Sequence, residues 1–255
     1  PARERRIRIL RRLGDDEGAH QLARAVIEAP LDALELGFAQ RTIGTATRTP
    51  VATTTVRLEG PTPGAIESFA LQLLTANGGT GWHLENQLPM ALLALVYWDW
   101  IYAPVQGAFV NAFQSAPLDL FWPDFFSTRE KMHPDPLSNP EPLCERIRRN
   151  YSTKAGIACR LVNWRRFEPR AMERIVDDVP DAVLRRIVGI ARSDLAQMRT
   201  GFPDLTVVYG NGKFEFVEVK GPGDNLQLNQ RLWHSRLADA GIRVRVVQFK
   251  PDDRP

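Results

Sequence analysis

The stretch GFPDLTVVYGNGKFEFVEVK, residues 201–220, decides the fold of this chain. Apolar residues flank an Asn-Gly step at 211–212, whose residues tolerate positive φ, and this pattern predicts a two-stranded hairpin. Side chains two apart in a strand share a face, so Glu218 and Lys220 point the same way. Because Asp204 opens the first strand, we expect it to meet Glu218 and Lys220 at one end of the hairpin.

The sequence after the hairpin predicts the rest of the sheet. A helix is expected from about Gln227 to Ala240, with Gly241 as its C-terminal stop. Residues 244–249 alternate in polarity and predict a third strand. The order strand, strand, helix, strand predicts an α/β fold built on a mixed sheet flanked by helices.

The first 45 residues predict a helical segment that precedes the α/β domain. Apolar residues recur at helical spacing over residues 4–35, which predicts two or three short helices. Residues 42–64 are rich in Thr, Pro and Gly and predict a loop with a short strand at 53–58. We therefore expect a helical segment over residues 1–45 and a second domain over residues 50–255.

Helices dominate the middle of the chain. They are predicted at about 63–76, from near Glu85 past Trp98, at 125–131, and repeatedly over 142–199. The glycines at 78–81 predict a break, and Pro89 suits a first helical turn, where a missing N–H costs little. Residues 115–142 hold six prolines and predict an irregular connector. We place a helical insertion at about 115–200.

The composition is that of an ordinary globular protein. Of 255 residues, 44% are hydrophobic and 25% charged, and the formal net charge of +3 means that any basic surface must be local. The longest apolar stretch, residues 88–98, is shorter than the about 20 residues that span a bilayer, and no signal-peptide pattern precedes it. We expect an intracellular protein, in the cytoplasm or nucleoid of a bacterium or the nucleus of a eukaryote. Cys144 and Cys159 lack metal-site spacing and are expected to be free thiols.

Asp204, Glu218 and Lys220 form a set suited to phosphodiester hydrolysis. Two carboxylates bind a hard divalent cation, and an ammonium beside them stabilises charge that grows on a phosphoryl group. The alternative is a solvated surface with ordinary strand-end charges. Alternation with Val217 and Val219, and the apolar strand that follows Asp204, favour a metal-dependent nuclease.

The same residues resemble a known signature. The Pro-Asp pair at 203–204 followed by Glu-Val-Lys at 218–220 is similar to the PD-(D/E)xK signature of the restriction-endonuclease-like superfamily. The string EVKGPGD at 218–224, followed by QRLW at 230–233, resembles its virus-type replication-repair nuclease (VRR-NUC) branch. The resemblance implies a restriction-endonuclease-like sheet and a VRR-NUC nuclease domain over residues 50–255.

Features further upstream resemble the Fanconi-associated nuclease family of that branch. Glu85 lies thirteen residues before the Trp-Asp pair at 98–99, and PLDL at 117–120 and Phe-Phe at 125–126 follow. The helices in residues 1–45 resemble the end of the tetratricopeptide-like region of that family. The chain is therefore expected to be a C-terminal piece of a longer protein.

The resemblance implies hydrolysis of DNA with one or two Mg²⁺ or Mn²⁺ ions. The implied metal ligands are Glu85, Asp204, Glu218 and the carbonyl of Val219. Lys220 would orient the attacking water, and Gln230 would position Lys220 or a bound water. The implied activity is that of a monomeric 5′-flap endonuclease and 5′ to 3′ exonuclease, acting on branched or 5′-flap duplex DNA in interstrand crosslink repair.

Basic residues gather between Arg146 and Arg170, with Tyr151 and Trp164 among them. Such a patch suits contact with the DNA backbone together with stacking on bases or strand ends. The expected DNA-binding residues are Arg146, Arg148, Arg149, Lys154, Arg165 and Arg166. The alternative is a solvated helix face in an Arg-rich chain.

Other aromatic and titratable residues are assigned structural roles. Trp233 is expected to pack against the sheet. His83, His133 and His234 are scattered along the chain, and this mechanism requires none of them, so they are interpreted as structural or surface residues.

Two other functions remain open at this stage. A dimer with the same chemistry could resolve four-way junctions. Alternatively, the domain could bind DNA through a nuclease fold that has lost activity, although such domains normally lack the acid or the lysine that this sequence retains.

Overall fold

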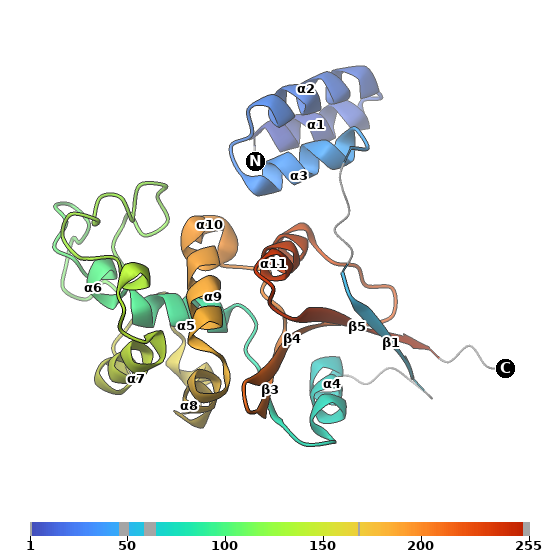
Figure 1. Ribbon diagram of the computed structural model, residues 1–255. Coiled ribbons are helices and arrows are strands. Elements are labelled where there is room, and N and C mark those ends of the chain that lie inside the picture. Colours follow the sequence, from blue (N-terminus) through green and yellow to red (C-terminus); the bar gives the residue numbers. More distant parts are fainter. Residues whose placement is uncertain (1, 46–50, 59–64, 168, 252–255) are drawn as a thin grey trace.

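The computed structural model describes residues 2–45, 51–58, 65–167 and 169–251. Five strands form one sheet in the order β1-β5-β4-β3-β2 (Figure 1). They are β1 (Thr53–Leu58), β2 (Thr80–His83), β3 (Leu205–Gly210), β4 (Lys213–Lys220) and β5 (Val244–Pro251). β1 and β4 run parallel to β5, whereas β2 and β4 run antiparallel to β3, so the sheet is mixed.

Helices flank this sheet and extend beyond it. They are α1 (Ala2–Arg12), α2 (Asp16–Glu28), α3 (Ala33–Thr42), α4 (Ile66–Thr75), α5 (Gln87–Val96), α6 (Trp98–Ile101), α7 (Leu143–Lys154), α8 (Pro169–Asp178), α9 (Asp181–Ser193), α10 (Leu195–Met198) and α11 (Leu228–Asp239), with 3₁₀ turns η1 (Pro136–Ser138) and η2 (Trp164–Arg166). In Figure 1, α4 and α11 lie on opposite sides of the sheet, and α5 to α10 form a group beside it. The expected α/β fold with a mixed, helix-flanked sheet is confirmed.

Alternation along β4 sends its side chains into two different cores. Val217 and Val219 pack in one cluster with Ala70 of α4. Phe216 belongs to the other cluster, which also holds the buried residues of α11. Glu218, two residues after Phe216, therefore faces α11, whereas its valine neighbours face α4.

The predicted hairpin turn joins β3 to β4. Asn211 has φ 53° and Gly212 has φ 71°, the left-handed conformations that a mirror-image two-residue turn requires. The register shifts between Val208 and Gly210, and beyond this irregularity Leu205 faces Val217.

β2 occupies a stretch whose glycines predict a break. These glycines are needed because neighbouring residues pack directly on the backbone. A Cβ on Gly79 would lie 2.8 Å from the ring of Tyr209, and one on Gly81 would lie 2.6 Å from Leu71 of α4. The strand that they permit ends at His83.

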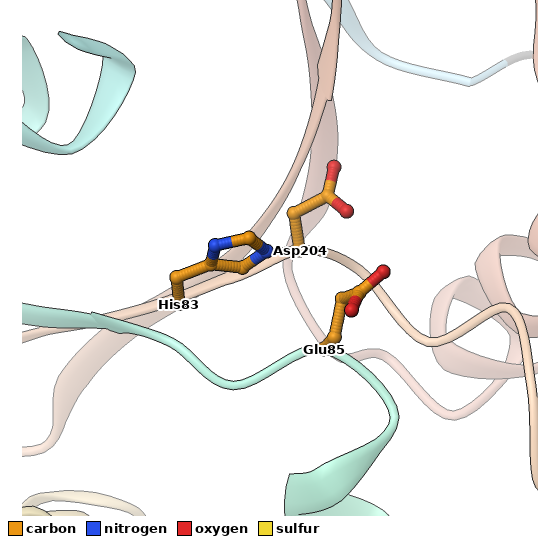
Figure 2. Close-up of side chains that lie close together, drawn as sticks. All are labelled: His83, Glu85 and Asp204. Carbon is orange, nitrogen blue, oxygen red and sulfur yellow. The ribbon is translucent and has the colours of Figure 1, made fainter. Parts of the chain in front are cut away.

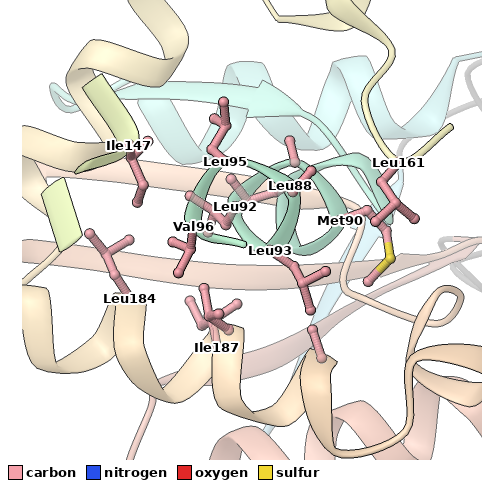
Figure 3. Packing of buried hydrophobic residues seen from close by; sticks show 14 of the residues in the cluster. Leu88, Met90, Leu92, Leu93, Leu95, Val96, Ile147, Leu161, Leu184 and Ile187 are labelled. Carbon is pink, nitrogen blue, oxygen red and sulfur yellow. The ribbon is translucent and has the colours of Figure 1, made fainter. Parts of the chain in front are cut away.

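α5 is buried on every side and anchors the helical group. All residues from Leu88 to Val96 are buried. Figure 3 shows Ile147 of α7 and Leu184 and Ile187 of α9 against it. Pro89 lies in the first turn of α5, as expected.

The helix predicted from near Glu85 past Trp98 forms, but it begins at Gln87 and is interrupted at Tyr97. Glu85 has φ 48°, and its N–H donates to the carbonyl of Asp204 over 3.1 Å. Glu85 thus continues the contact between β2 and β3 instead of starting a helix. At the other end α5 stops at Val96, and Tyr97 separates it from α6.

The short helix predicted at 125–131 is wrong, because this segment forms successive turns. In a helix the carbonyl of Phe125 would accept from the N–H of Arg129. That carbonyl instead accepts from the Arg129 guanidinium (3.0 Å), while the Arg129 N–H donates to Phe126 (3.1 Å). Two further bonds from the buried guanidinium to Asp119, of 2.7 and 2.9 Å, hold it there.

Residues 2–42 contain the expected helices, α1 to α3. Arg3 of α1 pairs with the buried Glu35 of α3, and Gln197 donates to Asp32 over 2.8 Å, which links α3 to the helical group. The strand predicted at 53–58 is β1, whereas residues 46–50 and 59–64, with the predicted start of the next helix, lie outside the described residues. Within the described part of the chain, no helix combines the length and apolarity needed to cross a membrane.

Candidate metal centre

The hairpin register brings the predicted catalytic side chains together. Since Leu205 faces Val217, extending the register by one residue places Asp204 opposite Glu218. The backbone N–H of Val219 donates to Oδ2 of Asp204 over 2.8 Å. Asp204 and Glu218 therefore meet where β3 starts and β4 ends, as the sequence predicts.

Glu218 is the most buried member of the group, with 0% of its side chain exposed. Its Oε1 lies 2.9 Å from Nζ of Lys220 and accepts from Nε2 of Gln230 over 2.6 Å. Its Oε2 is buried and has no hydrogen-bond partner among the described residues. A buried carboxylate oxygen without a partner is costly in a protein interior unless another group, such as a cation, binds it.

The backbone of α11 fixes the orientation of Gln230. Its Oε1 accepts from the N–H of Gln227 over 2.9 Å, as part of the capping box that starts the helix. This bond leaves Nε2 free to donate to Glu218. Gln230 thus lies where the sequence places it, but it touches Glu218 directly.

Burial and mutual repulsion raise the pKa values of both central carboxyls. Burial, followed by the charge of Asp204, raises the pKa of Glu218 to about 7, although Lys220 opposes the shift. Burial also raises the pKa of Asp204, with Glu85 adding to the effect and the Val219 N–H opposing it. Carboxylates that repel one another in a buried place fit a hard divalent cation, which would offset their charge.

Glu85 and His83 complete a group around Asp204. One ligand atom from each of the three residues lies within 4.8 Å of those of the other two. Figure 2 shows the three side chains together, with His83 on β2 and Glu85 just beyond it. Both His83 and Glu85 are exposed, so the centre opens to solvent on this side. The positive φ of Glu85 is a strained conformation for a side chain of its kind, and such strain concentrates at functional sites.

His83 was interpreted from the sequence as a structural or surface residue. It is on the surface, yet it also lies beside two of the predicted ligands. His83 lies there because β2 pairs with β3, which sets His83 opposite Leu205, next to Asp204. Recognising β2 in the sequence would have placed His83 near the site.

The carbonyl of Val219 faces the same edge of β4 as its N–H, because the two groups of one strand residue point to the same neighbouring strand. Since that N–H reaches Asp204, the carbonyl also lies on the side of the acidic group.

The predicted DNA-binding residues divide into two sets. Arg146 pairs with Glu141 over 2.8 Å, Arg149 pairs with the same carboxylate, and Arg148 pairs with Asp177.

The second set retains cations without a carboxylate partner in the described structure. Lys154 lies over the ring of Trp98, 5.9 Å from its centroid, and Arg165 and Arg166 are exposed in η2. The N–H of Asn163 donates to Oε1 of Gln87 over 3.2 Å, so η2 lies beside the start of α5 and near Glu85.

The remaining assignments concern packing. Trp233 is fully buried, edge-on to Phe202 at 4.9 Å, as expected. His133 is half-buried, and His234 is buried with no partner for either ring nitrogen among the described residues. Both cysteines are free thiols, as expected.

Comparison with known proteins identifies the class of domain first. The model of the VRR-NUC domain matches residues 138–251, a stretch that contains Asp204, Glu218, Lys220 and Gln230. The crystal structure of paFAN1 bound to 2nt 5′flap DNA with gap superposes with a TM-score of 0.88 at 30% identity, over 100% of this chain and 50% of that one. A second, with a 1nt 5′flap, gives a TM-score of 0.90 at 29% identity, over 99% and 50%.

Proteins of similar sequence then indicate which nucleases this chain resembles. The Fanconi-associated nuclease 1 homolog of Arabidopsis thaliana is 32% identical over 196 residues, covering 73% of this chain and 22% of its own length. The homolog of Pseudomonas aeruginosa is 33% identical, covering 75% and 35%. Over the part of the chain that carries the site, this chain is similar to Fanconi-associated nucleases and matches the VRR-NUC domain, and it spans about half the length of the two crystallised chains.

Proposed function

We propose that this chain is a metal-dependent, structure-specific DNA nuclease that cuts 5′ flaps and degrades DNA 5′ to 3′ in interstrand crosslink repair. The observation that carries the proposal is the buried Glu218, whose unpartnered oxygen lies among carboxyls with raised pKa values and beside Lys220. The VRR-NUC match and the similarity to Fanconi-associated nucleases support nuclease chemistry, and the paFAN1 structures, which are bound to 5′flap DNA, support the substrate class.

The residues would divide the work as follows. Asp204, Glu218, Glu85 and the Val219 carbonyl would hold one or two Mg²⁺ or Mn²⁺ ions, with His83 beside them. When bound, such an ion supplies Lewis acidity at a phosphoryl oxygen and lowers the pKa of a bound water.

Lys220 and Gln230 would act on the reacting groups and on Glu218. Lys220 carries its ammonium into the site, where it would orient the attacking water and offset charge on the phosphate. Gln230 would keep Glu218 in one rotamer through its 2.6 Å bond, so that Oε2 stays directed to the site. The sequence suggests that Gln230 would position Lys220 or a bound water. Its contact with Glu218 makes Glu218 the side chain that it would position.

DNA would approach over the basic surface between α7 and η2. Arg165 and Arg166 are exposed and lie near the start of α5, so they are best placed for backbone phosphates. Arg146, Arg148, Arg149 and Lys154 would contribute less, because three of them already face carboxylates and the fourth an aromatic ring.

The decisive experiment measures cleavage of a labelled 5′-flap duplex with Mn²⁺ and with EDTA. Wild type should cut only with the metal, and Asp204→Ala and Lys220→Ala should abolish cutting while binding persists. Equal, low activity in all three proteins would mean that the chain is a DNA-binding module without nuclease activity. A preference for four-way junctions by a dimer, measured by light scattering, would favour the resolvase.

A further inference from the structure

A row of aromatic rings crosses the helical group beside η2. Starting at Tyr151, it continues through Trp164, Trp98 and Tyr102 to Phe109, with successive ring centroids 5.7, 6.4, 4.9 and 6.0 Å apart. The last two rings are nearly parallel, with an interplanar angle of 19°. Trp98 is buried (6% exposed), so the middle of the row lies in the core, whereas Tyr102 and Phe109 are half-buried and reach the surface.

The row ends at an apolar hollow of about 680 Å³. Tyr102, Phe109, Phe113 and Ile157 are among the residues that line it. Phe113 is 93% exposed, and Ile157 is 47% exposed. A phenylalanine held almost entirely in water has no role in the core, and clustered exposed apolar groups mark binding surfaces.

The loop that presents Phe113 is held by specific hydrogen bonds. The single Tyr102 hydroxyl proton is shared between the carbonyls of Ser115 and Ala158, each 3.1 Å from the hydroxyl oxygen, which ties both ends of the loop to the segment before η2. The side chain of Gln114 accepts from the N–H of Asn111 over 3.0 Å. The exposed ring is therefore presented by an ordered turn.

Positive charge borders the aromatic row at its Trp98 and Trp164 end, whereas the loop itself carries no charge. Residues 103–118 contain no Asp, Glu, Lys or Arg. Lys154 lies over the ring of Trp98, and Arg165 and Arg166 follow Trp164 directly in η2. Stacking faces bordered by cations suit a polyanion with exposed flat groups, whereas an apolar protein segment would not need the cations.

We propose that Tyr102, Phe109 and Phe113 form a stacking shelf for the unpaired bases of single-stranded DNA. Arg165 and Arg166 would hold the phosphates between the shelf and the metal centre, since η2 is bonded to the start of α5. A duplex keeps its bases inside and cannot use such a shelf. The inference rests on the proposed function, because it assigns a place to the single-stranded part of a branched substrate.

Binding of single strands and duplexes in EDTA tests the shelf without cleavage. The probes are a fluorescein-labelled oligothymidylate and a blunt duplex, measured by anisotropy with the full chain. Phe109→Ala combined with Phe113→Ala should weaken single-strand binding about tenfold and leave duplex binding unchanged. Trp122→Ala is the matched control, since Trp122 is also exposed (61%) but lies outside the row and should have no effect.

Two single variants separate stacking from simple apolar contact. Phe113→Leu keeps the apolar volume without an aromatic face and should bind the oligothymidylate as weakly as Phe113→Ala. Phe113→Trp should bind as well as wild type or better. Unchanged single-strand affinity in the double variant, or full affinity in Phe113→Leu, would overturn the shelf and indicate a protein-docking surface.

Failure of the shelf and failure of the nuclease proposal remain distinguishable. If wild type does not cut the flap but the double variant still loses single-strand affinity, the shelf stands and the nuclease is lost. If wild type cuts with Mn²⁺ and the double variant binds and cuts like wild type, only the shelf is refuted. Unfolding temperatures equal to wild type would show that the loop variants are folded.

Discussion

Raising the pH without divalent cations should destabilise this chain through Glu218. Burial and Asp204 raise its pKa from 4.5 to about 7 in the folded state. A carboxyl with a raised pKa holds its proton more tightly when folded than when unfolded, so its stabilising contribution is complete below about pH 4.5. The contribution is lost as the pH rises through about 7, and the free energy of unfolding falls by about 3 kcal/mol. For a chain of this size, that corresponds to roughly 6–12 °C in Tm.

The assay compares thermal unfolding of wild type with that of Glu218→Gln at about pH 5 and pH 8, in EDTA. Glutamine keeps the oxygen that Lys220 and Gln230 contact but cannot titrate. The variant should lose the part of the pH dependence that comes from Glu218, whereas the raised pKa of Asp204 remains, because burial and Glu85 cause it. Mg²⁺ should restore Tm at pH 8 in wild type but little in the variant. Equal pH slopes in the two proteins, with no effect of Mg²⁺ on either, would refute the reasoning.

Three further predictions follow from single contacts. Gly201→Ala should lower stability by about 1–3 kcal/mol in a Tm measurement, because φ is 95° there and a Cβ would lie 2.5 Å from the backbone of Asn229; an unchanged Tm would contradict it. Asp119→Ala should cost about 3–5 kcal/mol in urea unfolding by leaving the buried guanidinium of Arg129 unpaired, and adding Arg129→Met should recover part of that loss. Lys220→Met should retain Mn²⁺ binding in calorimetry while cleavage of a 5′ flap falls by about a hundredfold or more, and loss of metal binding instead would assign Lys220 a structural role.

The core of the fold could be predicted because its signals are local. An Asn-Gly turn between two apolar runs defines β3 and β4, and alternation along β4 defines the shared face of Glu218 and Lys220, within about twenty residues of sequence. The edge strand β2 could not be found in this way, since its glycines match a loop pattern. A Cβ at Gly81 would clash with Leu71, and this contact, which the sequence does not reveal, explains why the strand has a glycine there.

The same limit explains why the backbone conformation at Glu85 and the position of His83 beside Asp204 could not be predicted. Helical periodicity extends back to Glu85, but its N–H is used by the Asp204 carbonyl, so the backbone cannot enter the helix at that residue. Asn86 makes a second cross-link by accepting from the N–H of Phe202 over 3.0 Å. Both contacts join segments more than a hundred residues apart, which no local pattern encodes. They place Glu85 and His83 against Asp204.

Gln230 shows why a sequence motif can identify a site residue and still misplace its contact. Its amide serves two purposes: the oxygen closes the capping box with Gln227, and the nitrogen donates to Glu218. A residue at the third helical position therefore couples the start of α11 to the orientation of a buried carboxylate. A glutamate at this position would keep the cap, but it would remove the N–H donor and add a negative charge beside Glu218. An amide is therefore needed both to start the helix and to orient the carboxylate.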